Sequence, residues 1–396
     1  MNDPLLAYRS EFPILDRTTY LVSNSLGAMP RTVPERLAEY VDEWAELGVR
    51  AWADGWWEMP VTAGNEIAPL LGASQGEVAM VSNVTTAQTA VLTALDYSPP
   101  RDTIVMTALD FPSVRYVYDL LAARLGARIV VVPSDDGVAI ELERLLGAID
   151  ARTRLVAISH VFFRSAFIVE VEAVCRRARE VGATVSLDGF HAVGVIPVDV
   201  KALDVDFYTG GVLKWLCGGP GGCFLYASSE HTARLEPAFT GWQAHQRPFG
   251  FEASMDYATG ARRWLNGTPP IPSLYAATEG PRIIRRAGIE RIRAKSIRQT
   301  QRLIELADAH GYSVTAPRAA ERRGGTVALD IPHAHEIAQV LLSRNVIVDY
   351  RPGAGIRIAP HFYTSDTELE SAIEHIDEAL KTGAWKQFAG KRSTVT

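Results

Sequence analysis

From about residue 76 the chain alternates between short β-branched, apolar runs and longer amphipathic stretches. The apolar runs predict strands over Thr103–Met106, Ile129–Val132, Leu155–His160, Thr184–Leu187, Asp206–Tyr208 and Cys223–Tyr226. The amphipathic stretches predict helices over Val84–Leu95, Pro112–Leu125, Ile140–Ile149 and Val171–Val181. Continuous apolar strands separated by helices of this length are typical of a mostly parallel sheet buried on both faces, so we expect an α/β fold.

The pattern changes after residue 272, where a long, arginine-rich helical stretch is predicted over Ala276–Gly311. Two short strands, a helix between them and a closing helix follow, over Gly325–Asp330, Val346–Val348, His335–Ser343 and Asp366–Leu380. This alternation indicates a smaller C-terminal α+β domain with its own sheet. We therefore divide the chain into an N-terminal arm (1–20), a large domain (21–272), a small domain (273–385) and a solvated tail (386–396).

Composition narrows the class of protein. The 396 residues include 40 basic and 46 acidic side chains, a net charge of −6, with no basic half. This balance argues against nucleic-acid binding and against a polybasic membrane surface. No apolar run approaches the roughly 18 residues of a membrane span, and the start of the chain lacks a signal-peptide pattern. Three cysteines favour reduced thiols, so we expect a cytoplasmic protein.

Several common active-site motifs do not occur. The chain has no G-x-x-x-x-G-K-[ST] and no G-x-G-x-x-G between a strand and a helix. Gly72-Ala-Ser-Gln-Gly76 matches G-x-S-x-G, but it follows no predicted strand and so is not a strand-to-helix elbow. His335-Glu336 lacks the second histidine of H-E-x-x-H, and Cys217 and Cys223 have no histidine at zinc spacing. Nucleotide phosphate loops, a serine-hydrolase elbow and a metal site are therefore not supported.

Two charged residues stand where loops leave predicted strands. Asp188 ends the run Thr184–Asp188, and Lys214 lies between two apolar strands, just before the glycine-rich turn Gly218–Gly222. In such sheets ligands bind beyond the carboxyl ends of the strands. A lysine in an apolar loop has a lowered pKa and can form a Schiff base with an aldehyde. A carboxylate can pair with a protonated pyridine nitrogen, and these are the two groups that a pyridoxal phosphate (PLP) site requires.

Two further segments complete this constellation. Thr85 and Thr86 put hydroxyls at the start of a helix, which favours phosphate binding. Phe111 follows a strand and could lie flat on an aromatic cofactor ring. Each residue alone has an ordinary structural explanation, as a cap, a surface lysine or a core aromatic. Their occurrence together, in this order on loops at one sheet edge, favours the PLP interpretation.

At these residues the sequence resembles fold-type-I PLP enzymes of the class V aminotransferase superfamily, and within it the kynureninase family. The resemblance extends from about residue 12 to 380. Its blocks are Asn24-Ser-Leu-Gly27, Phe111-Pro-Ser113, Ser159-His-Val161, Lys214-Trp-Leu-Cys-Gly-Gly-Pro-Gly221, Gly241-Trp242, Gly267-Thr-Pro-Pro270 and Ile356-Arg-Ile-Ala-Pro360.

The resemblance implies a large domain around a mostly parallel sheet of the seven-stranded type, and a role for each motif residue. Lys214 would hold PLP through a Schiff base, Asp188 would face the pyridine nitrogen, and Phe111 would stack on the ring. The other implied cofactor contacts are Thr85, Thr86, Ser113, His191, Trp242 and Thr268. Trp242 and Thr268 would reach the cofactor from a neighbouring subunit, which implies a homodimer with shared active sites. The implied substrate contacts are Asn24, Ser25 and Arg357, with Arg357 as the clamp for the α-carboxylate.

The chain departs from the family at two positions, which leaves the reaction open. In kynureninases a tyrosine commonly precedes the Schiff-base lysine and an aspartate follows Phe-Pro-Ser/Thr, whereas this chain has Leu213 and Val114. The alternatives are a kynureninase-like hydrolase or lyase, a transaminase, a cysteine desulfurase or C–S lyase, and a catalytically inactive binding protein. All cysteines precede residue 224, which disfavours the persulfide route of a desulfurase. The retained Lys214, Asp188 and Arg357 disfavour an inactive protein. Trp52, Trp56 and Trp57 could form an aromatic wall of the substrate pocket or a core cluster.

Overall fold

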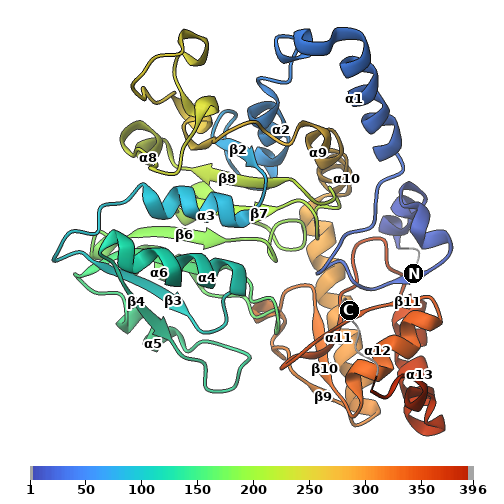
Figure 1. Cartoon of the computed structure of the whole chain (residues 1–396). Helices are drawn as coiled ribbons and strands as arrows, with labels where there is room; N and C mark the ends of the chain where they lie inside the picture. The colour runs from blue at the N-terminus through green and yellow to red at the C-terminus, as the bar shows by residue number, and fades with distance from the viewer. Residues whose placement is uncertain (1–2, 391–396) are drawn as a thin grey trace.

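A seven-stranded sheet forms the centre of the computed structural model, which describes residues 3–390 (Figure 1). Its order is β2-β8-β7-β6-β5-β3-β4. Its strands are β2 (Val78–Val81), β3 (Thr103–Thr107), β4 (Arg128–Val132), β5 (Thr153–Ser159), β6 (Thr184–Asp188), β7 (Phe207–Gly211) and β8 (Cys223–Ala227). Strands β7, β6, β5, β3 and β4 run parallel, and β8 is antiparallel to β7 and β2. The mostly parallel sheet is therefore as expected, and β2 is an additional strand that the pattern analysis did not predict.

Helices enclose this sheet on both faces. The helices in this part of the chain are α1 (Val33–Leu47), α2 (Met59–Ile67), α3 (Val84–Thr93), α4 (Pro112–Leu121), α5 (Leu142–Gly147), α6 (Val171–Glu180), α7 (Val200–Leu203), α8 (Ser229–Arg234) and α9 (Ile271–Ala277), of which α1 stands away from the sheet (Figure 1). Successive β5 residues alternate between two cores, with Val156 and Ile158 in one and Leu155 and Ala157 in the other. This alternation explains why the strands are continuously apolar. None of the helices among residues 3–390 combines the length and apolar character needed to cross a membrane.

A second, four-stranded antiparallel sheet has the order β12-β13-β10-β9. It comprises β9 (Ser313–Val314), β10 (Val327–Asp330), β12 (Asp349–Arg351) and β13 (Gly355–Ile358). Helices α11 (Ile289–Ala309), α12 (Ala334–Ser343) and α13 (Asp366–Thr382) lie beside this sheet (Figure 1). Near the start of the chain, β1 (Thr19–Tyr20) pairs in parallel with β11 (Val346–Ile347), so the N-terminal segment joins the C-terminal part of the structure. The domain limits at residues 21, 273 and 386 remain a prediction.

Two local expectations differ from the structure. The single helical stretch over Ala276–Gly311 is wrong, because α9, α10 (Glu279–Ala287) and α11 are separate helices. Gly288 separates α10 from α11 with a φ of +86°, a conformation that favours glycine. The tail is not simply solvated: its first residues complete the 3₁₀ helix Ala384–Phe388, and Phe388 packs against the core beside the second sheet. Directly before the tail, the Trp385 ring stacks on His333 at 3.4 Å between centroids. The rest of the predicted tail includes residues 391–396, which lie outside the described residues.

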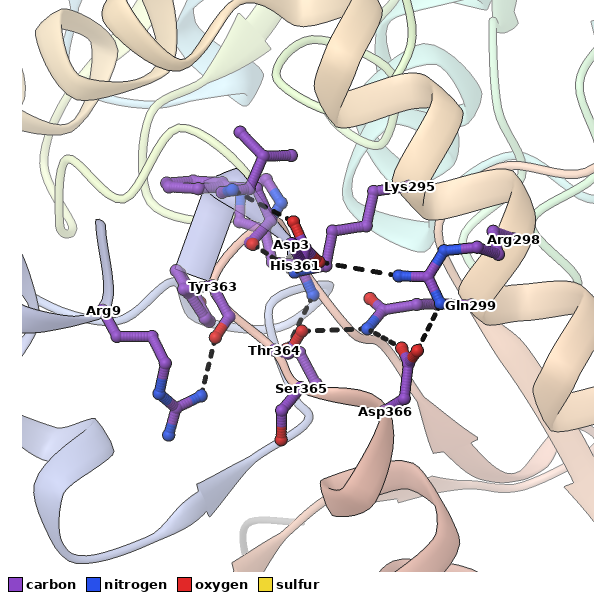
Figure 2. Close-up of polar contacts among 12 residues, drawn as sticks. Asp3, Arg9, Lys295, Arg298, Gln299, His361, Tyr363, Thr364, Ser365 and Asp366 are labelled. Carbon is purple, nitrogen blue, oxygen red and sulfur yellow. Dashed lines mark hydrogen bonds and ion pairs between the residues drawn. The ribbon is translucent and has the colours of Figure 1, made fainter. Parts of the chain in front are cut away.

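The N-terminal 3₁₀ helix η1 (Pro4–Glu11) is bound to the turn that follows β13 (Figure 2). Arg9 donates to the carbonyl of Tyr363 at 2.6 Å. Asp3 pairs at 2.7 Å with the buried ammonium of Lys295, which also donates to the carbonyl of Phe362 at 2.6 Å. From the same turn, His361 Nε2 donates to the carbonyl of Trp215 at 2.8 Å. The arm therefore supports a turn that contacts the residue directly after Lys214.

Candidate active site

The carboxyl ends of the parallel strands bring the predicted site residues to one edge of the large sheet. In the register of the sheet, Ser159 of β5 lies opposite Asp188 of β6, and Asp188 lies opposite Thr209 of β7. Helix α3 begins three residues after β2 ends at the same edge, and Lys214 follows β7 by three residues. Loops that are far apart in the sequence therefore meet around one point.

A cavity of about 190 Å³ lies at this point. It is lined by Val84, Phe111, Ser159, Val161, Phe163, Asp188, Phe190, His191, Leu213 and Lys214. Four predicted site residues therefore share one cavity: Phe111, Asp188, His191 and Lys214. The remaining wall is mainly apolar, which weakens the solvation of any charge placed inside.

Lys214 is held with its amine inside this cavity. Its Nζ lies 2.6 Å from His191 Nε2 and 4.5 Å from the centre of the Phe190 ring. Burial, assisted by the positive charge of Arg357, lowers the pKa of the Lys214 ammonium to about 7. Burial also holds the pKa of His191 well below its usual range, so the histidine is neutral and its Nε2 can accept a hydrogen bond from the lysine. A large fraction of Lys214 is thus a neutral, nucleophilic amine near pH 7.

Asp188 faces the same cavity from the end of β6. Its Oδ1 accepts a hydrogen bond from the Phe190 N–H at 2.9 Å, and its carbonyl accepts one from the His160 N–H at 2.9 Å. Burial raises the pKa of the Asp188 carboxyl to about 6. A carboxylate so poorly solvated is stabilised by a cationic partner in the cavity, which a protonated pyridine nitrogen would supply.

The N-terminus of α3 lies between this cavity and a second one. Val84, the first residue of α3, lines the Lys214 cavity, whereas Thr86 lines a neighbouring cavity of about 180 Å³. Asn83 caps the helix, and its Oδ1 accepts from both the N–H (2.9 Å) and the hydroxyl (3.2 Å) of Thr86. The cap is therefore Asn83, while Thr85 stands in the first turn, where helix N–H groups attract anions.

Two predicted contacts lie away from the Lys214 cavity of their own chain. Thr268 lines the neighbouring cavity together with Thr86. Trp242 is 44% exposed, packs edge to face on Trp57 at 4.9 Å, and donates its indole N–H to the carbonyl of Pro248 at 2.6 Å. Ser113, in the first turn of α4, is not part of the cavity lining either. The cofactor roles of these residues remain predictions.

The predicted substrate residues meet where the N-terminal segment contacts the second sheet. Arg357, on β13, is buried and donates through Nη1 to the carbonyl of Phe163 at 2.5 Å. Ser25 Oγ lies 3.5 Å from Nη2 of Arg351. Asn24 is fully buried, yet its amide nitrogen and oxygen have no hydrogen-bond partner within the described part of the chain. An unpaired buried amide is costly, so Asn24 is suited to bind a group that the protein itself does not supply.

With this geometry established, the chain can be compared with known proteins. Residues 19–361 match the family described as Aminotransferase class-V. The chain belongs to this family. Kynureninase from Burkholderia pseudomallei strain 1106a is 31% identical over 414 residues, which cover 100% of this chain and 97% of the relative. Kynureninase from Pseudomonas fluorescens is 31% identical over 401 residues, with coverage of 98% and 95%. The resemblance to class V enzymes, and to kynureninase among them, is confirmed.

Solved structures of PLP fold type I share this class V architecture. A cysteine desulfurase from Thermococcus onnurineus NA1 superposes with a TM-score of 0.85 at 24% identity, covering 96% of this chain and 99% of that one. The cystine C–S lyase C-DES, in complex with its product cysteine persulfide, superposes with a TM-score of 0.84 at 21% identity, covering 92% and 98%. These similarities confirm the predicted fold.

Some residues that line the Lys214 cavity were not predicted from the sequence. Phe163 and Phe190 line the cavity, but isolated phenylalanines next to strands are usually core residues and carry no separate signal. The tryptophans near residue 55 do not line the Lys214 cavity. Trp56 is instead buried and donates to the hydroxyl of Tyr275 at 3.0 Å, as expected of a core cluster.

Gly27 lets the N-terminal segment of this class V chain approach the Lys214 turn closely. Its N–H donates to the carbonyl of Leu213 at 2.8 Å, and a Cβ at Gly27 would lie 2.2 Å from the carbonyl oxygen of Lys214. We expect Gly27→Ala to displace this turn, to lower the free energy of unfolding by about 1–3 kcal/mol, and to weaken PLP binding. Denaturant unfolding and PLP titration measure both effects.

The matched control is Gly147→Ala, at the end of α5. A Cβ there meets no atom within 4 Å, and the backbone does not adopt a positive φ. We expect this variant to change the free energy of unfolding by less than about 1 kcal/mol. Equal stability and equal PLP affinity of the two variants would contradict the close approach at Gly27.

Proposed function

We propose that this class V protein is a PLP-dependent enzyme that acts on an L-amino acid. Among such reactions we propose kynureninase-like hydrolysis of a Cβ–Cγ bond, which converts a kynurenine-type substrate into alanine and an aromatic acid. The observation that carries the proposal is the amine of Lys214, with its lowered pKa, in one cavity with Asp188 and Phe111. The full-length similarity to kynureninases supports the choice of reaction.

The residues present fit PLP. The Lys214 amine can bind the aldehyde carbon, and the buried Asp188 carboxylate suits the pyridine nitrogen. The Phe111 ring forms part of the cavity wall, and the N-terminus of α3 suits the phosphate. Fully buried and unpaired, the Asn24 amide is a further sign that the site is completed by a bound group. When bound, PLP supplies an electron sink for the pair released at the substrate α-carbon.

Four side chains of the site would take separate roles in substrate binding and proton transfer. Arg357 would orient the substrate α-carboxylate, and the apolar wall around Phe111 would exclude water from the reacting atoms. Lys214, once displaced by the substrate amine, would take the α-proton at Nζ and hold it next to His191. Asp188 would keep the opposite end of the site negative and so favour the protonated pyridine. In the overall hydrolysis the Cβ–Cγ bond breaks, the hydroxyl of water joins Cγ and a proton joins Cβ.

A specific observation keeps two alternatives in consideration. Leu213 lines the cavity at the position where kynureninases commonly carry a tyrosine hydroxyl, so position 213 offers no proton donor. Transamination or C–S bond cleavage of another amino acid are the alternatives. A persulfide-forming desulfurase is less well supported, because all three cysteines are buried and burial raises the pKa of the Cys217 and Cys223 thiols to about 12.

We further propose a cytoplasmic homodimer with shared active sites. Trp242 and Thr268 lie outside the Lys214 cavity of their own chain, which is consistent with a role in a neighbouring subunit. The three buried, unpaired thiols are consistent with a reducing compartment. Light scattering of the purified protein, and complementation between Lys214→Ala and Trp242→Ala chains, test the assembly.

The reaction is tested by incubating the PLP-loaded protein with L-kynurenine and with 3-hydroxykynurenine. We expect stoichiometric release of alanine and of the anthranilate product. A keto acid whose formation requires a second keto acid would instead establish a transaminase. Sulfide or persulfide from cysteine or cystine, with no anthranilate from kynurenine, would establish a C–S lyase and overturn the proposed hydrolysis.

A further inference from the structure

The arginine proposed to bind the substrate carboxylate is already paired with a buried carboxylate. Asp349 of β12 lies directly opposite Arg357 of β13 in the antiparallel register. The two residues are 0% and 2% exposed, so water does not weaken their interaction. Arg357 Nε donates to Asp349 Oδ1 at 2.8 Å, and Nη2 donates to Oδ2. Both oxygens of Asp349 therefore accept hydrogen bonds from one edge of the guanidinium.

This pairing limits how a substrate can approach Arg357. Five N–H groups of an arginine form a rigid planar fork, and the Nε/Nη2 edge is the one that Asp349 occupies. One proton of Nη1 is used by the carbonyl of Phe163, whose ring lines the Lys214 cavity. The donors left on Arg357 are one proton of Nη1 and the second proton of Nη2, and the edge between Nη1 and Nη2 is the one that Asp349 leaves open.

Asp349 also links Arg357 to the N-terminal segment. Its Oδ2 lies 3.2 Å from Nη2 of Arg351, and the same Nη2 lies 3.5 Å from Ser25 Oγ. The single buried carboxylate of Asp349 thus partly neutralises the positive charges of two arginines, beside the loop that carries the unpaired amide of Asn24.

We propose that Asp349 is a positioning residue, which holds the guanidinium of Arg357 end-on to the substrate carboxylate and offsets its charge toward Lys214. This inference rests on the proposed role of Arg357 in substrate binding. It adds a residue that no family motif in the sequence identified, since Asp349 lies eight positions before Arg357 and outside the family-like block Ile356–Pro360.

The effect on Lys214 has a definite sign. The positive charge of Arg357 lowers the pKa of Lys214, whereas the negative charge of Asp349 raises it. Removing only the charge of Asp349 should therefore lower the pH at which the Schiff-base chromophore of the PLP-loaded protein loses its proton. A residue that merely supports the fold would leave this midpoint unchanged.

The test uses two substitutions in the PLP-loaded full chain. Asp349→Asn removes the charge, and we expect the chromophore midpoint to fall by about one pH unit. Asp349→Glu keeps the charge but moves it by one methylene, so we expect an unchanged midpoint and at least about tenfold weaker binding of propionate. Propionate is used because it has a carboxylate but no amine, and its binding is followed by its effect on the chromophore.

The matched control is Asp330→Asn, the same substitution at an exposed aspartate of β10 in the same sheet. We expect it to change neither the midpoint nor the propionate affinity. If Asp349→Asn fails to fold because it leaves Arg357 unpaired, the double variant Asp349→Asn/Arg357→Gln removes both charges and should fold. If that neutral pair also fails to fold, Asp349 is a structural residue and the inference is overturned.

Arg357→Gln separates this inference from the proposed function. If Arg357→Gln leaves propionate affinity unchanged, the proposed role of Arg357 is wrong and the inference falls with it. If Arg357→Gln weakens propionate binding but neither Asp349 variant shifts the midpoint or the affinity, the role of Arg357 stands and the inference about Asp349 alone is overturned.

Discussion

Replacement of Lys214 by alanine is expected to abolish the Schiff-base chromophore and to reduce turnover by about a thousandfold or more. The reason is that Lys214 is the only lysine in the cavity lining, and burial lowers the pKa of its ammonium to about 7. No other residue in that lining can attack an aldehyde as an amine. Absorbance spectra of the PLP-loaded variant and steady-state rates with the preferred substrate measure the two losses.

The control for this variant is Lys201→Ala, which removes a lysine whose ammonium pairs with Glu77 at 2.5 Å on the surface. We expect it to keep the chromophore and the rate. Added methylamine should restore part of the turnover of Lys214→Ala if the missing group is an amine and the fold is intact. A chromophore that persists in Lys214→Ala would refute the assignment of the whole site.

Asp188→Asn is expected to lower turnover by about a hundredfold to a thousandfold while keeping the Schiff base. The amide has the shape of the carboxylate, and its oxygen can still accept from the Phe190 N–H, as Asp188 Oδ1 does at 2.9 Å. It lacks the negative charge that would stabilise a protonated pyridine, so the electron sink is weakened. The drop in kcat with a retained chromophore distinguishes this loss from that of Lys214→Ala.

The pH dependence of PLP uptake by the apoprotein provides a second measurement of Asp188. The pKa of Asp188, raised to about 6, and that of Lys214, lowered to about 7, both favour uptake as pH rises, since the carboxylate and the neutral amine are the binding forms. We expect PLP uptake by the unsubstituted protein to increase from pH 5 to pH 8. In Asp188→Asn the increase near pH 6 should disappear, and the increase near pH 7, which is due to Lys214, should remain. Identical profiles for the two proteins would exclude a charged Asp188 from PLP binding.

Much of the fold could be predicted because the buried strands of the large sheet are recognisable from their apolar and β-branched residues. Strands β5 and β6 are buried on both faces, so apolar residues occur on both faces of each strand and make the strands recognisable in the sequence. The positions of Asp188 and Lys214 followed from the rule that loops at the carboxyl edge of a parallel sheet share one site. Both residues line the same cavity in the structure.

The parts that could not be predicted depend on contacts between distant segments. The break between α10 and α11 at Gly288 is hidden in a continuous amphipathic pattern, because the pattern of apolar positions does not reveal that this one glycine adopts a φ of +86°. The Trp385–His333 stack joins residues more than fifty positions apart. The pairing of Asp349 with Arg357 depends on the register of a hairpin, and a shift by one residue would turn Asp349 to the other face.

The central claim is that Lys214 holds PLP, and borohydride reduction followed by peptide mapping tests it most directly. Reduction converts a Schiff base into a stable amine link, so the modified lysine can be identified by mass. Few other lysines could carry the label, since the lysines of the chain are Lys201, Lys214, Lys295, Lys381, Lys386 and Lys391. We predict one phosphopyridoxyl group per chain, on Lys214. A label on the buried Lys295, on a surface lysine, or on no residue would contradict the account.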